Sequence, residues 1–134
     1  MKKQTFYLEK YDWNVTILYD IKKEHLSNVI KALKQLNAPQ SIVYKAIDNI
    51  VENKQNNGIT YSNNHSSLVI IGNTSNKPNF ANTLIHEIFH LAIHIAREYD
   101  ITPYGEEIAY ISGEIGEITL PIASQYLCCQ CHKH

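Results

Sequence analysis

The stretch LIHEIFHLAIHI, residues 84–95, constrains this chain more than any other part of its sequence. It belongs to a longer segment, residues 79–99, in which apolar residues cover nearly every side of a helix, and such a helix is usually buried. Four titratable side chains nevertheless interrupt it: His86, Glu87, His90 and His94. Because buried titratable groups are costly unless they are paired or bound to a metal, the segment predicts a site as well as a core helix.

The first three of these residues form an HExxH motif. Residues four apart lie one turn apart on the same side of a helix, so both imidazoles reach one point, where they can bind a zinc ion at about 2.0–2.1 Å. Glu87 lies about 100° round the helix, close enough to reach a water on the metal without binding the ion. We therefore predict His86 and His90 as metal ligands and Glu87 as general base. The alternative is a pair of core histidines bonded to carbonyl groups, with Glu87 in an ion pair.

A catalytic zinc site needs a third protein ligand and one open position. His94 is one further turn along, but three residues stacked on a straight helix span about 12 Å, which is too far for one ion. A ligand from another helix closes the site better, and the sequence EEIAYISG predicts such a helix from Glu106. The candidates are Glu106, Glu107, Glu114, Glu117, His94 and the cysteines and histidines of the C-terminal tail.

HExxH followed by a glutamate that opens E-x-x-A on a second helix resembles the gluzincin-type zinc metallopeptidases, a group of zincins. The resemblance implies hydrolysis of a peptide or protein substrate with Zn²⁺ as cofactor. It assigns His86, His90 and Glu106 as zinc ligands and Glu87 as the catalytic glutamate. Glu107 stays open as the third ligand because two adjacent glutamates leave the register undecided, and both could simply complement the helix dipole. Tyr110, one turn after Glu106, is a candidate catalytic oxyanion donor, or a core residue.

The order of the predicted elements is also similar to that of small uncharacterised metallopeptidases of bacterial mobile elements and prophages. This similarity covers most of the chain and implies no substrate. The metzincin continuation is absent, because LAIHIA follows His90 in place of a glycine and a third histidine at metzincin spacing.

Elsewhere, period-2 and helical patterns predict two hairpins and three further helices. The expected strands are residues 5–10 with 14–20 and 59–62 with 67–72. The expected helices are residues 23–36, residues 39–54 with Asn56-Asn57-Gly58 as the stop signal, and one from Glu106 to Leu127 with a bend or break at Gly113, Gly116 or Pro121.

These elements predict an α+β fold of the minimal zincin type, with residues 1–134 as a single domain. A small, mostly antiparallel sheet from residues 5–20 and 59–72 should pack on helices that include the HExxH helix. In zincins one sheet edge lies above the metal and receives substrate as an added strand. Residues 67–72 are the expected edge strand, since they directly precede the HExxH helix.

Composition excludes other classes of function. A formal net charge of -1 predicts no nucleic-acid surface, and no apolar run is long enough to span a membrane. The N-terminal segment MKKQTFYLEKYD has no apolar core of a signal peptide, so we expect a cytoplasmic protein. A chain of 134 residues has little room for a specificity domain, so a partner or a homodimer is expected to complete the cleft.

The C-terminal tail contains Cys128, Cys129, Cys131, His132 and His134. Three interpretations stay open: a structural metal site, a thiolate that folds back on the zinc as an inhibitor, and cysteines that pack as small apolar residues, which we favour. Two other classes of function also stay open. One is a non-catalytic zinc-binding sensor or interaction module, and the other is a partner protein of a mobile element whose motif is structural.

Overall fold

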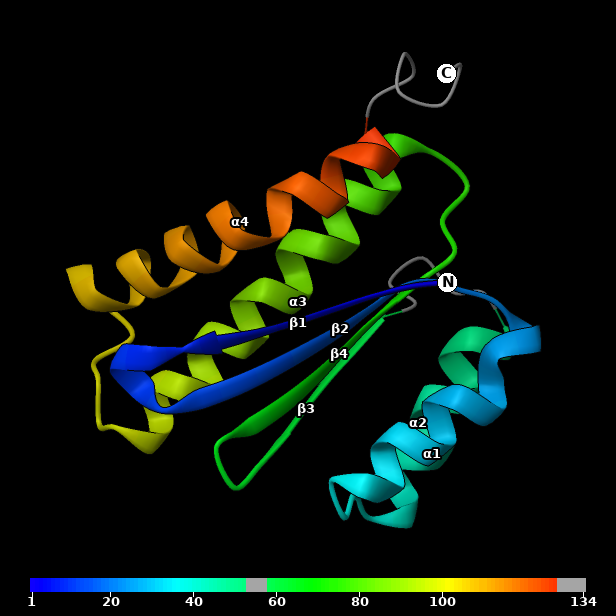
Figure 1. Ribbon diagram of the computed structural model, residues 1–134, viewed down its shortest axis with the longest axis horizontal. Helices are drawn as coiled ribbons and strands as arrows, with labels where there is room; N and C mark the ends of the chain where they lie inside the picture. Colours follow the sequence, from blue (N-terminus) through cyan, green and yellow to red (C-terminus); the bar gives the residue numbers. More distant parts are fainter. Residues whose placement is uncertain (53–57, 128–134) are drawn as a thin grey trace.

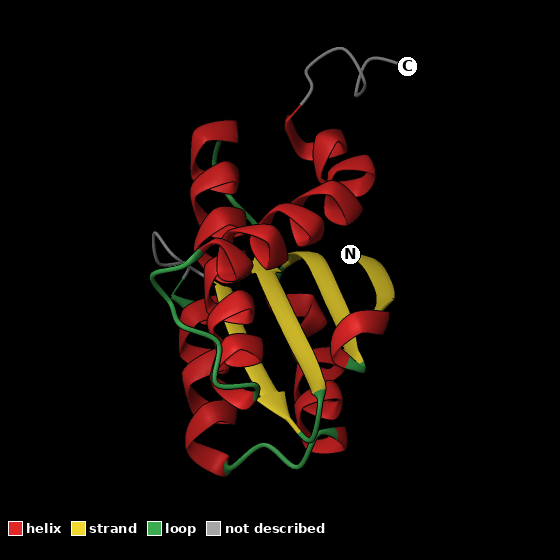
Figure 2. Ribbon diagram, turned by 90° about the vertical axis from the view of Figure 1, so that its left-hand side faces the viewer, coloured by secondary structure: helices red, strands yellow, loops and turns green. Residues whose placement is uncertain are grey.

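The chain folds into three layers, with a four-stranded sheet between two pairs of helices (Figure 1). The computed structural model describes residues 1–52 and 58–127. One face of the sheet carries α1 (Leu26–Gln35) and α2 (Gln40–Val51). The other face carries α3 (Lys77–Glu98) and α4 (Glu106–Leu127), as the second view shows (Figure 2). The predicted α+β class is confirmed, with helices on both faces of the sheet.

The sheet has the strand order β1-β2-β4-β3 and one parallel pair. β1 (Lys2–Leu8) and β2 (Trp13–Ile21) form one antiparallel hairpin, and β3 (Gly58–Asn63) and β4 (Ser66–Gly72) form the other. β2 and β4 pair in parallel and join the two hairpins. Both predicted hairpins and the mostly antiparallel sheet are therefore confirmed.

The prediction that residues 67–72 form an edge strand is wrong. β4 lies between β2 and β3, and its side chains from Ser67 onward are buried on both faces of the sheet, which explains why this strand is almost continuously apolar. β1 and β3 are the two edge strands, and β3 is the one that lies next to α3; no other strand of the described ranges pairs with its outer side. Position in the sequence just before α3 does not determine position in the sheet.

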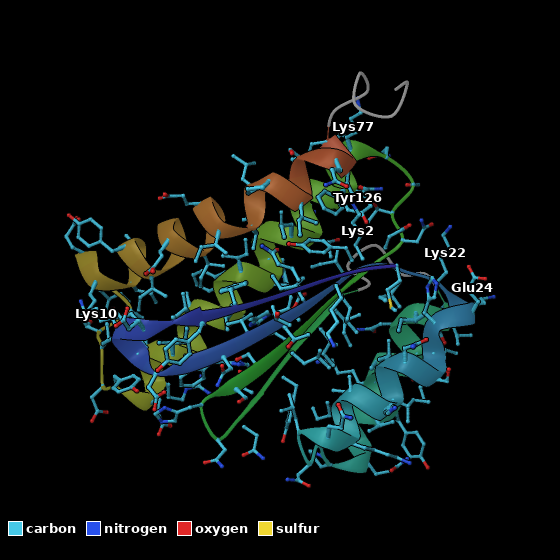
Figure 3. All side chains as sticks on the ribbon, viewed as in Figure 1. Lys2, Lys10, Lys22, Glu24, Lys77 and Tyr126 are labelled. Carbon is cyan, nitrogen blue, oxygen red and sulfur yellow. The ribbon has the colours of Figure 1, made fainter. Side chains whose placement is uncertain are left out.

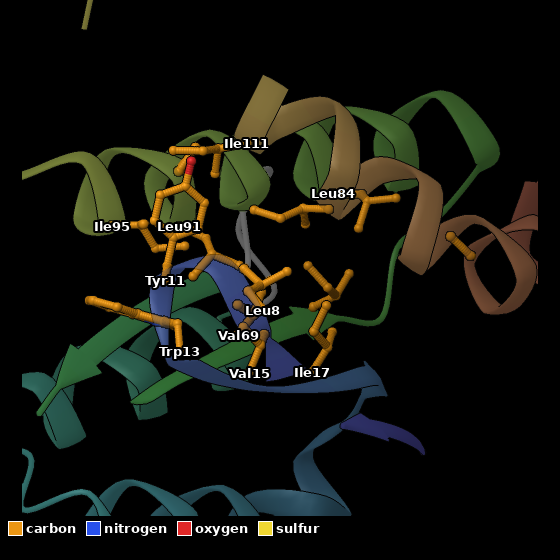
Figure 4. Packing of buried hydrophobic residues seen from close by; sticks show 14 of the residues in the cluster. Leu8, Tyr11, Trp13, Val15, Ile17, Val69, Leu84, Leu91, Ile95 and Ile111 are labelled. Carbon is orange, nitrogen blue, oxygen red and sulfur yellow. The ribbon is translucent and has the colours of Figure 1, made fainter. Parts of the chain in front are cut away.

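Two hydrophobic cores hold the layers together. Alternate residues of β2 divide between them: Val15, Ile17 and Tyr19 face α3 and α4, and Leu18 faces α1 and α2. Tyr11 joins the first core next to residues of α3 and α4 (Figure 4). Fully burying one large apolar side chain stabilises the fold by about 1.5–3 kcal/mol, so both helical layers are firmly attached to the sheet.

The helices agree with the sequence patterns except in α4. α3 begins after Asn76, whose Oδ1 accepts a hydrogen bond from the Asn79 backbone N–H at 2.9 Å. The break expected within the last helix is absent, because α4 is one uninterrupted helix. Pro121 lies on the exposed side of α4. Thr119 and Ala123, on either side of it in the sequence, are buried, so the helix packs against the core both before and after the proline. No helix of the described ranges is long and apolar enough to cross a membrane.

Candidate metal centre

His86 and His90 form a close pair in the middle of α3. Their Nε2 atoms lie 3.1 Å apart, and their ring centroids lie 4.7 Å apart with the rings at 71°. Both residues are exposed, and the His86 side chain keeps 44% of its surface accessible. The helical spacing predicted from the sequence therefore brings two imidazoles together where solvent ions reach them.

Two imidazole nitrogens at this distance need a hydrogen atom or a cation between them, because two lone pairs facing each other repel. One ring can donate an N–H···N hydrogen bond to the other, or both nitrogens can bind one metal ion. Two nitrogens bound to one tetrahedral zinc ion at about 2.0–2.1 Å lie about 3.3 Å apart. The observed separation of 3.1 Å is close to that value, so the pair fits two of the ligands of a zinc site.

Glu87 is the buried carboxylate beside the pair. Only 2% of the residue is exposed, and its Oε1 accepts a hydrogen bond from the Thr60 hydroxyl of β3 at 2.8 Å. The second oxygen, Oε2, lies 3.9 Å from His86 Nε2. Burial raises the pKa of Glu87, while the Thr60 hydroxyl and the two histidines act in the opposite direction. The carboxyl group is therefore fixed at one oxygen and directed toward the imidazoles at the other.

Gly58, the first residue of β3, makes room for this carboxylate. A Cβ built at Gly58 would lie 2.8 Å from Glu87 Cγ, 2.9 Å from Glu87 Oε2 and 2.9 Å from the Ile70 carbonyl oxygen. The sequence pattern predicted Gly58 as part of a helix stop signal. The close approach of β3 to α3 gives it a second role that no local pattern carries, since the contact joins residues distant in sequence.

The face of β3 toward α3 is small and polar over its whole length. Gly58, Thr60 and Ser62 alternate along it, and Ser62 Oγ lies 2.6 Å from His94 Nδ1. His94 is thus hydrogen-bonded to the sheet one turn after His90. Burial lowers the pKa of His94, as do the neighbouring His90 and Arg97.

α4 lies over the opposite part of the sheet from the histidine pair. At its start, Glu107 Oε1 accepts a hydrogen bond from the Tyr11 hydroxyl at 3.0 Å and lies 3.4 Å from Lys10 Nζ, near the β1–β2 turn (Figure 3). Further along α4, the Ile118 carbonyl accepts a hydrogen bond from the Gln4 side chain of β1 at 2.9 Å. Glu87, in contrast, contacts β3 at the other edge of the sheet. Glu107 is therefore held away from the pair.

The structure does not bring Glu106 to the pair either. Within residues 1–52 and 58–127, no group of three or more His, Cys, Asp or Glu side chains is placed to hold a metal ion. Tyr110 is 71% exposed on α4 and makes no hydrogen bond with the described residues. The tail candidates, from Cys128 to His134, lie outside the described residues. Glu106 as third ligand and Tyr110 as oxyanion donor remain predictions from the sequence.

Comparison of the chain with protein-family models, with curated proteins and with solved structures gives no match in any of the three.

Proposed function

We propose that the chain is a zinc-dependent peptidase in which His86 and His90 bind the metal and Glu87 is the general base. The proposal depends on one observation: the two Nε2 atoms lie 3.1 Å apart, with Glu87 Oε2 3.9 Å from His86 Nε2. When bound, zinc supplies Lewis acidity, which polarises a carbonyl group and activates water near neutral pH.

Glu87 is suited to accept a proton and return it. Burial raises its pKa, which makes the carboxylate a better proton acceptor, and Thr60 holds Oε1 so that Oε2 stays directed to the pair. In the proposed reaction, Oε2 accepts a proton from the attacking water and delivers it to the leaving amine. One water and one peptide bond give one acid and one amine, and Glu87 ends as it began.

The outer edge of β3, which no strand of the described residues pairs, favours an extended peptide as substrate. An edge strand offers unpaired backbone N–H and C=O groups, and a peptide can pair with them as an added strand. Gly58 and Thr60 of this strand contact Glu87. A peptide paired there would therefore lie beside the proposed base.

One observation favours a second candidate, a non-catalytic zinc-binding sensor or interaction module. The described residues offer two imidazoles to a metal but no third ligand. Such a module would bind zinc without turnover, whereas a partner protein with a purely structural motif would bind none.

Metal content separates these candidates first. We expect one zinc per chain by elemental analysis, retained in Glu87→Gln and lost in His86→Ala and His90→Ala. His25→Ala is the matched control, because His25 lies just before α1 and bonds the Lys22 backbone. A wild-type chain that binds no zinc after metal loading would end the proposal.

Turnover then separates enzyme from module. Wild-type and Glu87→Gln proteins, both loaded with zinc, are compared on a fluorescence-quenched peptide library. Loss of the general base should lower the rate by about 10²–10⁴-fold. Equal rates in the two proteins would show that Glu87 is not the base, and zinc binding without any cleavage would favour the non-catalytic module.

A further inference from the structure

A polar pocket of about 450 Å³ lies between the β3–β4 turn and the C-terminal half of α3. Its lining includes Trp13, Ser62, His65, His94, Arg97 and Glu98. His94 lies one turn after His90, the proposed metal ligand, so the pocket lies next to the candidate metal centre on the C-terminal side along α3. None of the chemistry proposed above uses it.

A chain of hydrogen bonds, buried at Trp13 and partly buried at Ser62, leads into this pocket. Trp13 Nε1 donates to Ser67 Oγ at 2.8 Å, Ser67 Oγ lies 2.6 Å from Ser62 Oγ, and Ser62 Oγ lies 2.6 Å from His94 Nδ1. An indole N–H can only donate, which fixes the direction at the first step. Ser67 is 2% exposed, and Ser62 Oγ is the acceptor within its reach among the described residues. The Ser67 hydroxyl therefore donates to Ser62, and Ser62 donates to His94.

This direction fixes the tautomer of His94. Since Nδ1 accepts a hydrogen bond, the ring hydrogen of the neutral imidazole is on Nε2. Within the described ranges, Nε2 has no hydrogen-bond partner. His94 therefore offers one N–H donor to a ligand, and three side chains, one from each of β2, β4 and β3, hold it in that state.

The charges around the pocket favour an anion. Arg97 lines it and makes no hydrogen bond or ion pair with the part of the chain that the structure describes. Glu98 is the carboxylate of the lining, and its Oε1 lies 3.4 Å from His65 Nε2. His65 in turn stacks on Trp13 at 5.1 Å between ring centroids, which holds it in place. Among the described residues that line the pocket, the guanidinium of Arg97 is thus the cation left for a ligand.

We propose that this pocket binds the C-terminal carboxylate of a peptide substrate, with Arg97 as the cation and the His94 Nε2–H as a hydrogen-bond donor. The use of the pocket in catalysis rests on the proposed peptidase function. Arg97 lies seven positions after His90 on α3, a rise of about 10.5 Å, which an extended peptide covers in about three residues. A peptide running parallel to β3 with its C-terminus in the pocket would be cut about three residues from that end.

Binding tests the pocket independently of hydrolysis. The probes are acetyl-trialanine with a free carboxylate and the same peptide as its C-terminal amide, added to full-length, zinc-loaded Glu87→Gln protein and followed by ¹H–¹⁵N NMR. We expect at least tenfold tighter binding of the free acid, with shifts at Asn64, His65 and the His94 ring nitrogens. Arg97→Gln should remove this preference and Arg97→Lys should restore part of it. Lys34→Gln, on α1 across the sheet, should retain it.

Equal affinity for acid and amide, no binding of either peptide at millimolar concentration, or an unchanged preference in Arg97→Gln would each overturn the inference. The same titration of the metal-free wild-type chain separates the two proposals. A carboxylate preference that persists in a chain without zinc or turnover supports the pocket while the peptidase proposal fails. Cleavage that depends on Glu87 but is equally fast with the C-terminal acid and the amide would support the peptidase proposal and overturn the pocket proposal.

Discussion

Replacing Gly58 with alanine should perturb the candidate metal centre from outside the HExxH motif. The added methyl group would lie 2.8 Å from Glu87 Cγ and 2.9 Å from both Glu87 Oε2 and the Ile70 carbonyl oxygen. The Glu87 side chain can move, but the Ile70 oxygen belongs to the backbone of the central strand β4. We expect Gly58→Ala to push the Glu87 carboxylate away from Thr60 and to strain the pairing of β3 with β4.

The magnitude follows from two opposing effects. Inserting a methylene or methyl group into a packed site costs about 1–3 kcal/mol. Alanine in place of glycine also restricts the unfolded chain, which stabilises by about 0.4–1 kcal/mol where the backbone is compatible. The net loss in free energy of unfolding should therefore be about 1–2 kcal/mol, which urea denaturation resolves.

A double-mutant cycle isolates the contact with Glu87. In a Glu87→Ala background the side-chain part of the clash disappears and the part with Ile70 remains. Gly58→Ala should then cost at least 0.5 kcal/mol less, on the order of the coupling seen between contacting residues. A Gly58→Ala chain as stable as wild type, or one equally destabilised in both backgrounds, would refute the reasoning.

Two further predictions concern buried polar groups. Trp13→Phe removes the N–H donated to Ser67 and should lower the free energy of unfolding by about 1–3 kcal/mol, and the His94 ring ¹⁵N shifts should change because nothing then fixes the tautomer. Unchanged His94 shifts would contradict the directed hydrogen-bond chain. In the metal-free protein, burial raises the pKa of Glu87 in the folded state above its unfolded value, so the folded chain binds more protons and its stability should fall as pH rises above about 4.5. Glu87→Gln should lessen this fall in urea titrations from about pH 4 to 7, and identical slopes for both proteins would argue against a desolvated carboxyl group.

Local patterns in the sequence predicted the elements well because their causes are local. The apolar run around His86 predicted α3 to within a few residues, and the helical period alone places His90 one turn away. β-branched runs separated by polar turns predicted both hairpins. The burial of Glu87 does not follow from the pattern alone, because the same segment leaves Ile85 and Phe89 exposed and β3 is what covers the carboxylate.

Other features depended on contacts between distant residues. No local signal shows that β4 pairs in parallel with β2, yet that pairing places β4 in the centre and leaves β3 at the edge. The hydrogen bond between Ser62 and His94 is another such contact, because the two residues are 32 positions apart in the sequence. The small or polar residues Gly58, Thr60 and Ser62 of β3 give no sign in the sequence of which helix they contact.

The sequence by itself determined that two imidazoles and a carboxylate lie within about one turn of a helix, because the period of an α-helix is fixed by its own hydrogen bonds. Only the tertiary structure decided which strand borders that turn and on which side α4 packs. The hydrophobic effect favours burial but has no direction, so an apolar pattern predicts which residues are buried and not which residues they contact. Strand pairing and helix packing determine these contacts, and they place Glu107 beside Tyr11 and Gly58 beside Glu87.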